Sequence, residues 1–159
     1  MTRALFPGSF DPFHNGHLEV VERARCLFDD VVVAVLCNPQ KGEPLFSAEE
    51  RQQMVAECLA KYDNVEIVSM TTLVVDVARS VGADVIVKGL RAVTDFENEL
   101  QMAQMNQQLA GVETLMLPTG SAYSFISSRL VREVARYGGD VSAFVPDPVA
   151  VRMKERFGG

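Results

Sequence analysis

The sequence predicts an α/β fold, a Rossmann-like doubly wound parallel sheet of five strands with helices on both faces. Short apolar segments rich in β-branched residues alternate with segments of helical periodicity along the whole chain. Several of the short segments are apolar at nearly every position, as strands buried on both faces require. The 159 residues, 48% of them hydrophobic, are enough for one core, so we expect a single domain over 1–159.

The expected elements follow one another in strict alternation. The strands are Arg3–Phe6, Val31–Leu36, Val65–Ser69, Val85–Lys88 and Thr114–Pro118. The helices between them are His17–Phe28, Ser47–Lys61, Leu73–Val81 and Thr94–Ala110. Ser47 with Glu50 matches a capping box and marks the start of the second helix. A helical segment of about 127–157 follows the last strand, made of Ser127–Tyr137, a Gly138-Gly139 stop and Pro148–Phe157.

Composition excludes several classes of partner. The net charge of −6 argues against nucleic acid and anionic membranes, both of which favour a basic surface. No apolar run approaches the roughly 20 residues that span a bilayer, and the N-terminus lacks the apolar core of a signal peptide. The cysteines, Cys26, Cys37 and Cys58, are odd in number and show no metal-ligand spacing. We therefore expect a cytoplasmic protein with no nucleic-acid or membrane partner.

Four polar clusters come directly after predicted strands. They are GSFDPFHNGH at 8–17, NPQKGEP at 38–44, KGLR at 88–91 and PTGSAYSFISSR at 118–129. In an open parallel sheet, ligands bind beyond the carboxyl ends of the strands, where the strand order reverses. The four clusters are therefore predicted to form one site.

The first cluster is typical of an anion site at the start of a helix. Gly8 would let the backbone approach a ligand, and His14 and His17 have the spacing at which helical side chains share a face. Backbone N–H groups and the helix dipole favour a phosphate there. Two alternatives stay open: the histidines are capping or surface groups around an Asn15-Gly16 turn, or they are a metal pair, for which no third ligand has a matching spacing.

The other clusters supply cations and hydroxyls. Lys88 and Arg91 flank the bare backbone of Gly89, as a phosphate site would require, whereas Lys41 alone is better explained as a solvated side chain. Ser127 or Ser128 can cap the following helix and leave N–H groups for a second anion. Glu97 and Glu99 lie at the acidic start of a helix, and this pattern alone predicts that they are solvated.

The motifs that are missing narrow the chemistry. The chain contains no G-x-S-x-G elbow, no Walker A motif and no G-x-G-x-x-G. Acyl hydrolysis, P-loop phosphoryl transfer and ordinary dinucleotide oxidoreduction therefore lose support. Histidine, lysine, arginine and helix N-termini without a nucleophile favour phosphoryl or nucleotidyl transfer by positioning and charge neutralisation.

Two segments resemble the signatures of the nucleotidyltransferase superfamily. GSFDPFHNGH is similar to its T/H-x-G-H motif, and YSFISS is similar to its ISS(T/S) motif. Together with NPQK, VVDVARS, VKGLR and DFENELQMAQMN, they resemble the bacterial phosphopantetheine adenylyltransferase family from Ala4 to about Pro148. Two positions depart from the family pattern: His14 stands where threonine is more common, and Arg129 stands where a hydroxyl is usual.

The resemblance implies a reaction and its partners. The reaction is reversible transfer of AMP from ATP to 4′-phosphopantetheine, giving dephospho-coenzyme A and pyrophosphate by in-line attack, with Mg²⁺ and no covalent intermediate. Family members are commonly homohexamers, dimers of trimers, with coenzyme A as a feedback inhibitor. Rival interpretations are a nicotinate-mononucleotide adenylyltransferase and a non-catalytic nucleotide-binding regulatory domain.

The resemblance also implies roles for particular residues. His17 would stabilise the transition state at the α-phosphate, with Lys41 and Arg91 as further catalytic groups. Phosphopantetheine would bind Ser9, Lys41, Val74 and Lys88. No side chain is implied as a resident metal ligand. ATP would contact Ser9, Phe10, His17, Gly89, Leu90, Arg91, Glu99, Tyr123, Ser124, Phe125, Ile126, Ser127, Ser128 and Arg129.

Overall fold

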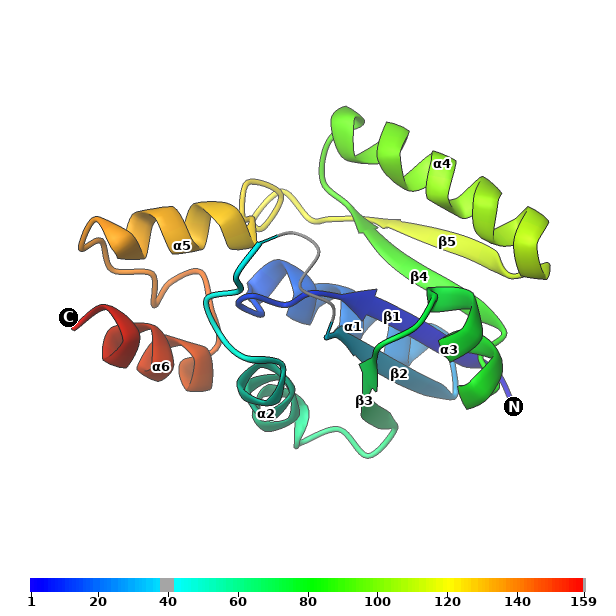
Figure 1. Ribbon diagram of the computed structural model, residues 1–159, viewed down its shortest axis with the longest axis horizontal. Coiled ribbons are helices and arrows are strands. Elements are labelled where there is room, and N and C mark those ends of the chain that lie inside the picture. The colour runs from blue at the N-terminus through cyan, green and yellow to red at the C-terminus, as the bar shows by residue number, and fades with distance from the viewer. Residues whose placement is uncertain (38–41, 159) are drawn as a thin grey trace.

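The computed structural model describes residues 1–37 and 42–158. Strands and helices alternate through most of this length, and two helices end the chain (Figure 1). The strands are β1 (Arg3–Gly8), β2 (Asp30–Leu36), β3 (Val65–Met70), β4 (Val85–Leu90) and β5 (Glu113–Pro118). The helices are α1 (Asn15–Leu27), α2 (Ala48–Leu59), α3 (Val74–Val81), α4 (Val93–Ala110), α5 (Ser128–Arg136) and α6 (Asp147–Phe157).

The five strands form one parallel sheet in the order β3-β2-β1-β4-β5. The chain moves outward from β1 to β3, then crosses back to place β4 on the other side of β1. The strand order therefore reverses between β1 and β4, and the predicted Rossmann-like, doubly wound sheet is confirmed. Ligands of such sheets bind at this reversal.

Alternate residues of the strands feed two separate hydrophobic cores. Phe6 of β1 and Val33 of β2 belong to the larger core, which α1, α2, α5 and α6 cover. Leu5 and Val32, their neighbours in sequence, belong to the smaller core under α3. Because successive side chains of a strand point to opposite faces, this division places helices on both faces of the sheet.

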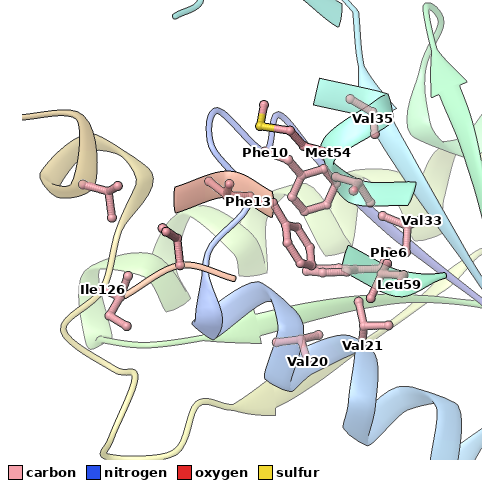
Figure 2. Close-up of a cluster of buried hydrophobic side chains, with 14 of the residues drawn as sticks. Phe6, Phe10, Phe13, Val20, Val21, Val33, Val35, Met54, Leu59 and Ile126 are labelled. Carbon is pink, nitrogen blue, oxygen red and sulfur yellow. The ribbon is translucent and has the colours of Figure 1, made fainter. Parts of the chain in front are cut away.

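The larger core extends beyond the end of β1, toward the site. Phe10 and Phe13, which follow β1, are both buried and lie beside Phe6, with Met54 of α2 close by (Figure 2). The ring centroid of Phe10 lies 5.4 Å from that of Phe6 and 5.5 Å from that of Phe13, with edge-to-face geometry. Phe10 and Phe13 therefore anchor the GSFDPFHNGH segment in the larger core, beside Phe6.

The element bounds lie within two residues of the predicted ones. β1 extends to Gly8 and β4 to Leu90, so the first residue of GSFDPFHNGH and the first three of KGLR belong to strands instead of following them. We predicted a start at His17, but α1 begins at Asn15, because the His14 side chain caps the helix. The Ser47 and Glu50 capping box of α2 is confirmed, as is Ser127 as the cap of α5. None of the helices in the described ranges has the length and apolar character that crossing a membrane requires. The three cysteines are free thiols.

Candidate functional site

A cavity of about 190 Å³ lies at the point where the strand order reverses. Its walls come from the end of β1 and the loop after it, the first turn of α1, the end of β4, the start of α4, and Thr119 after β5. The chemically active side chains in these walls are His14, His17, Lys88, Arg91, Asp95 and Glu99. The site therefore joins segments that lie far apart in sequence.

The loop after β1 takes its shape from Phe10. Its φ of 51° lies in the left-handed region, which side chains other than glycine rarely adopt, yet its ring is buried. The ring folds back over Gly8, where a Cβ would lie 2.7 Å from Phe10 Cζ. The Phe10 ring therefore requires glycine at position 8, while Gly8 also lines the cavity, and its role in the approach of a ligand stays a prediction.

Asp11 and Arg132 hold the same loop from two sides. The Asp11 carboxylate accepts hydrogen bonds from the backbone N–H groups of Leu45 and Phe46, at 2.8 and 3.0 Å. Arg132 Nη1 of α5 donates to the Asp11 carbonyl at 2.5 Å. The buried Asp11 carboxylate thus stabilises the loop, and Arg132 connects the loop to α5.

Arg51 ties the loop to the end of β2. This buried arginine of α2 donates through Nη1 to the carbonyls of Ser9 and Leu36, at 2.7 and 2.6 Å, and through Nε to the Phe46 carbonyl at 3.1 Å. Ser9 follows β1 and Leu36 ends β2, so the two carbonyls belong to the ends of neighbouring strands. One guanidinium therefore fixes the relative position of two strand-exit loops.

His14 and His17 form a reciprocal cap at the start of α1. His14 Nδ1 accepts from the Gly16 N–H at 3.0 Å, and His17 Nδ1 accepts from the His14 N–H at 3.1 Å. The two rings stack with centroids 3.6 Å apart. Because Nδ1 is the acceptor in both neutral rings, the proton of each ring lies on Nε2. Both imidazoles line the cavity, and each carries one N–H donor, on Nε2.

Both imidazoles are held in the neutral form. Burial, and then the charge of Arg91, lowers the pKa of His14 from 6.5 to about 3. The pKa of His17 is also held well below 6.5, first by burial among aromatic rings and then by His14, Arg91 and Lys88. The site therefore keeps the same two uncharged donors across the physiological pH range.

Two cations reach the cavity from the end of β4, and each meets a carboxylate of α4. Lys88 Nζ lies 3.5 Å from Glu99 Oε1. Arg91 binds Asp95 through two nitrogens, Nε to Oδ2 at 3.1 Å and Nη2 to Oδ1 at 3.3 Å. Arg91 Nη1 also donates to the Ile126 carbonyl at 2.9 Å. Arg91 thus links β4, the first turn of α4 and the segment before α5.

The family model named Cytidylyltransferase-like matches residues 5–134 of this chain. Two curated proteins called phosphopantetheine adenylyltransferase, from Frankia casuarinae and Frankia alni, are each 54% identical over 160 residues, covering 98% of this chain and 98% of theirs. The chain belongs to the phosphopantetheine adenylyltransferase family. The resemblance carried by the two signatures and the segments between them is therefore confirmed.

A solved structure shares the fold of this phosphopantetheine adenylyltransferase family member. The lipopolysaccharide core biosynthesis protein of Thermoplasma volcanium superposes with a TM-score of 0.56 at 20% identity, over 76% of this chain and 97% of that one. At this identity the likeness concerns the arrangement of sheet and helices.

The structure brings six of the predicted site residues into the cavity wall. Phe10, His17, Lys88, Gly89, Arg91 and Glu99 all line the cavity. Ser9 is exposed directly beside Phe10, and the Leu90 carbonyl accepts from the Thr119 N–H at 2.8 Å. Val74 opens α3 and packs against the smaller core, away from the cavity walls. Lys41 lies outside the described residues.

The second signature, from Tyr123 to Arg129, adjoins the cavity without lining it. Ser127 caps α5 through its hydroxyl, and the Ser128 hydroxyl donates to the Pro12 carbonyl at 2.8 Å, so this segment is bound to the first signature. Phe125 is largely exposed. Arg129 extends along α5 and pairs with Glu133 at 3.1 Å.

Sequence reasoning missed Asp95 and Thr119, which both line the cavity. Asp95 stands four residues after Arg91, a spacing at which charged side chains pair on a helix, so this signal was available. The sequence pattern alone predicted a solvated Glu99, whereas Glu99 pairs with Lys88 in the cavity wall. Buried Arg51 left no local signal, because its partners are backbone carbonyls from three separate segments.

The metal-pair alternative for the histidines does not fit the geometry. Each neutral ring uses its single lone pair, on Nδ1, to accept a backbone N–H, so neither offers a free lone pair to a metal. Within 1–37 and 42–158, no three His, Cys, Asp or Glu side chains gather closely enough to hold a metal ion. The capping alternative is confirmed, but it coexists with the role of both rings as cavity walls.

Proposed function

We propose that this chain transfers AMP from ATP to 4′-phosphopantetheine, giving dephospho-coenzyme A and pyrophosphate. The observation that carries the proposal is the cavity at the strand-order reversal, whose wall combines two neutral imidazoles with Lys88 and Arg91. Family membership supplies the substrates, and the cavity supplies groups suited to bind their phosphates.

The reaction balances without a protein nucleophile. An oxygen of the acceptor phosphate attacks the α-phosphorus of ATP, a new P–O bond forms, and the bond to the β-phosphate bridging oxygen breaks to release pyrophosphate. The acceptor phosphate is already anionic at neutral pH, so no general base is needed. The chain has to hold two anions in line and to offset the charge that develops between them.

His17 is proposed as the transition-state stabiliser. Its Nδ1 is occupied by the His14 N–H, which places the proton on Nε2 and fixes the ring orientation. A pre-oriented, uncharged donor binds the oxygens of a pentavalent phosphorus without having to gain or lose a proton. Lys41 and Arg91 are proposed as further catalytic cations, which offset the repulsion between the two substrates.

The remaining residues are proposed to divide between the two substrates. Ser9, Lys41, Val74 and Lys88 would bind phosphopantetheine. ATP would contact Ser9, Phe10, His17, Gly89, Leu90, Arg91, Glu99 and the segment from Tyr123 to Arg129. The bond from Arg91 to the Ile126 carbonyl supports this division, because it ties the second signature to a cavity cation.

Mg²⁺ is proposed to enter with ATP. Magnesium in nucleotide sites is usually held by substrate phosphates, waters and one or two carboxylates. Asp95 and Glu99 are the carboxylates of the described cavity wall, and both are engaged by cations. The ion would supply charge neutralisation at the phosphates.

Assembly, regulation and location are also proposals. A homohexamer built as a dimer of trimers, with coenzyme A as feedback inhibitor, is proposed from family membership. The large apolar side chains exposed on α4, among them Met102, Met105 and Leu109, support burial of this helix by other copies. A cytoplasmic location is proposed because three free thiols suit a reducing compartment.

One assay tests the proposed function. Pyrophosphate release from Mg-ATP is measured with 4′-phosphopantetheine, with nicotinate mononucleotide and with no acceptor. We expect turnover with phosphopantetheine alone. Turnover only with nicotinate mononucleotide would assign the chain to that other adenylyltransferase reaction, and ATP binding without any turnover would make it a regulatory domain.

A further inference from the structure

The carboxylate of Asp95 binds Arg91 within the cavity wall. Both residues line the cavity, and two of the three guanidinium nitrogens of Arg91 bind Asp95, at 3.1 and 3.3 Å. The third donates to the Ile126 carbonyl. A planar carboxylate held by two parallel N–H bonds occupies the same kind of position that two oxygens of a phosphate would occupy.

The described cavity wall carries no net charge. Lys88 and Arg91 contribute two positive charges, Asp95 and Glu99 contribute two negative ones, and the two imidazoles are uncharged. Each cation is paired within the wall at 3.5 Å or less. A phosphate that binds Arg91 therefore has to compete with a carboxylate already in place.

We propose that Asp95 is an internal competitor for phosphate, which limits how tightly the site holds pyrophosphate by keeping a carboxylate on Arg91. Pyrophosphate is the product that must leave, and the return of the Asp95 carboxylate to Arg91 favours the release of pyrophosphate. This inference rests on the proposed function, since it assumes that pyrophosphate is a product of this site.

The partial exposure of the pair sets the size of the effect. The Arg91 and Asp95 side chains are 35% and 29% exposed, so solvent screens their attraction. Ion pairs of this kind typically contribute about 0.2–1 kcal/mol, which corresponds to roughly a 1.4- to 5-fold change in affinity. Removing the Asp95 charge should therefore strengthen pyrophosphate binding by up to about fivefold.

Asp95→Asn is the suitable variant. Asparagine keeps the shape of the side chain and one oxygen acceptor for an Arg91 N–H, but it lacks the negative charge. Glu97→Gln is the matched control, because it removes a charge from the same turn of α4 at an exposed residue that does not line the cavity. Circular dichroism and thermal unfolding of both variants check that the fold is intact.

The experiment measures binding of magnesium pyrophosphate to the full-length chain by titration calorimetry, together with product inhibition of ATP turnover by pyrophosphate. For Asp95→Asn we expect a roughly 1.4- to 5-fold lower dissociation constant and a matching fall in the inhibition constant. Glu97→Gln should leave both constants unchanged.

Three results would overturn the inference. Weaker binding in Asp95→Asn would show that Asp95 positions Arg91 for the ligand, and unchanged binding would show that it does not compete. An equal gain in Glu97→Gln would mean that only the general charge of α4 matters. A wild-type chain that binds no pyrophosphate and shows no turnover would instead contradict the proposed function itself, and with it this inference.

Discussion

The His14 and His17 rings stack with their centroids 3.6 Å apart, and the His14 backbone N–H donates to His17 Nδ1 at 3.1 Å. This relationship sets the tautomer of His17 by backbone structure, so its Nε2–H is available without any protonation equilibrium. Burial and neighbouring cations lower the pKa of both rings, which keeps the donors uncharged. The first signature is therefore both a helix cap and a pair of aimed hydrogen-bond donors.

His17→Gln should lower kcat by roughly 10²- to 10³-fold with little change in the KM for ATP, because one aimed transition-state hydrogen bond is lost. Glutamine at this third helical position can still reach back to the N-cap N–H, so the helix start should persist. Steady-state kinetics check the prediction. An unaltered kcat would remove His17 from the transition state.

Gly16→Ala should disturb the stacked pair. A Cβ at Gly16 would lie 2.9 Å from His14 Cε1, and the His14 ring cannot retreat freely because it is packed on His17. We expect a destabilisation of about 1–3 kcal/mol, as for overpacked interiors, and a lower kcat. Chemical denaturation and turnover measure the two effects. Wild-type values for both would contradict the close approach of the His14 ring to this glycine.

The free energy of unfolding should fall as the pH falls from 7 to 5. In the unfolded chain each histidine takes up a proton with a pKa near 6.5. In the folded chain the pKa of both is lower, about 3 for His14, so protonation favours the unfolded state. For His14, linkage then gives a loss of about 2 kcal/mol over this interval, and the lowered pKa of His17 acts in the same direction. Urea denaturation at several pH values measures it.

His14→Thr provides the control for this pH dependence. Threonine can still cap the helix, but it does not titrate in this range. The loss of stability between pH 7 and pH 5 should shrink by about 2 kcal/mol in this variant. An identical slope in wild type and variant would mean that His14 titrates normally in the folded chain.

Arg51→Met should destabilise the chain by about 2–3 kcal/mol, because the carbonyls of Ser9, Leu36 and Phe46 would lose a buried, charged donor. It should also raise the KM values, since two strand-exit loops lose their common anchor. Arg79→Met is the matched control: this arginine is 69% exposed, and its loss should change stability by less than about 0.5 kcal/mol. Equal effects of the two substitutions would exclude the anchoring role.

The fold was predictable because its signals are local. Apolar runs such as Val31–Leu36 identified buried strands, and the Ser47 capping box marked a helix start that the structure confirms. The strand-order reversal followed from the class of sheet, and the cavity found there is lined by Phe10, His17, Lys88, Gly89, Arg91 and Glu99 of the predicted ligand-binding residues.

The details of the site were less predictable because they depend on tertiary contacts. The positive φ of Phe10 and the glycine at position 8 are related by a tertiary contact, because the Phe10 ring occupies the space that a Cβ of residue 8 would need. Arg51 binds carbonyls, which any sequence provides, so no pattern reveals it. The spacing of His14 and His17 indicated proximity but could not separate a cap, a metal pair and a phosphate site.

Exchange of labelled pyrophosphate into ATP tests the central claim, direct transfer of AMP between two substrates held in one cavity. Mg-ATP and labelled pyrophosphate are incubated with the chain, with and without 4′-phosphopantetheine. We predict that label enters ATP only when phosphopantetheine is present, because the reverse reaction requires dephospho-coenzyme A. Label entering ATP without an acceptor would reveal an adenylylated enzyme and would contradict direct transfer.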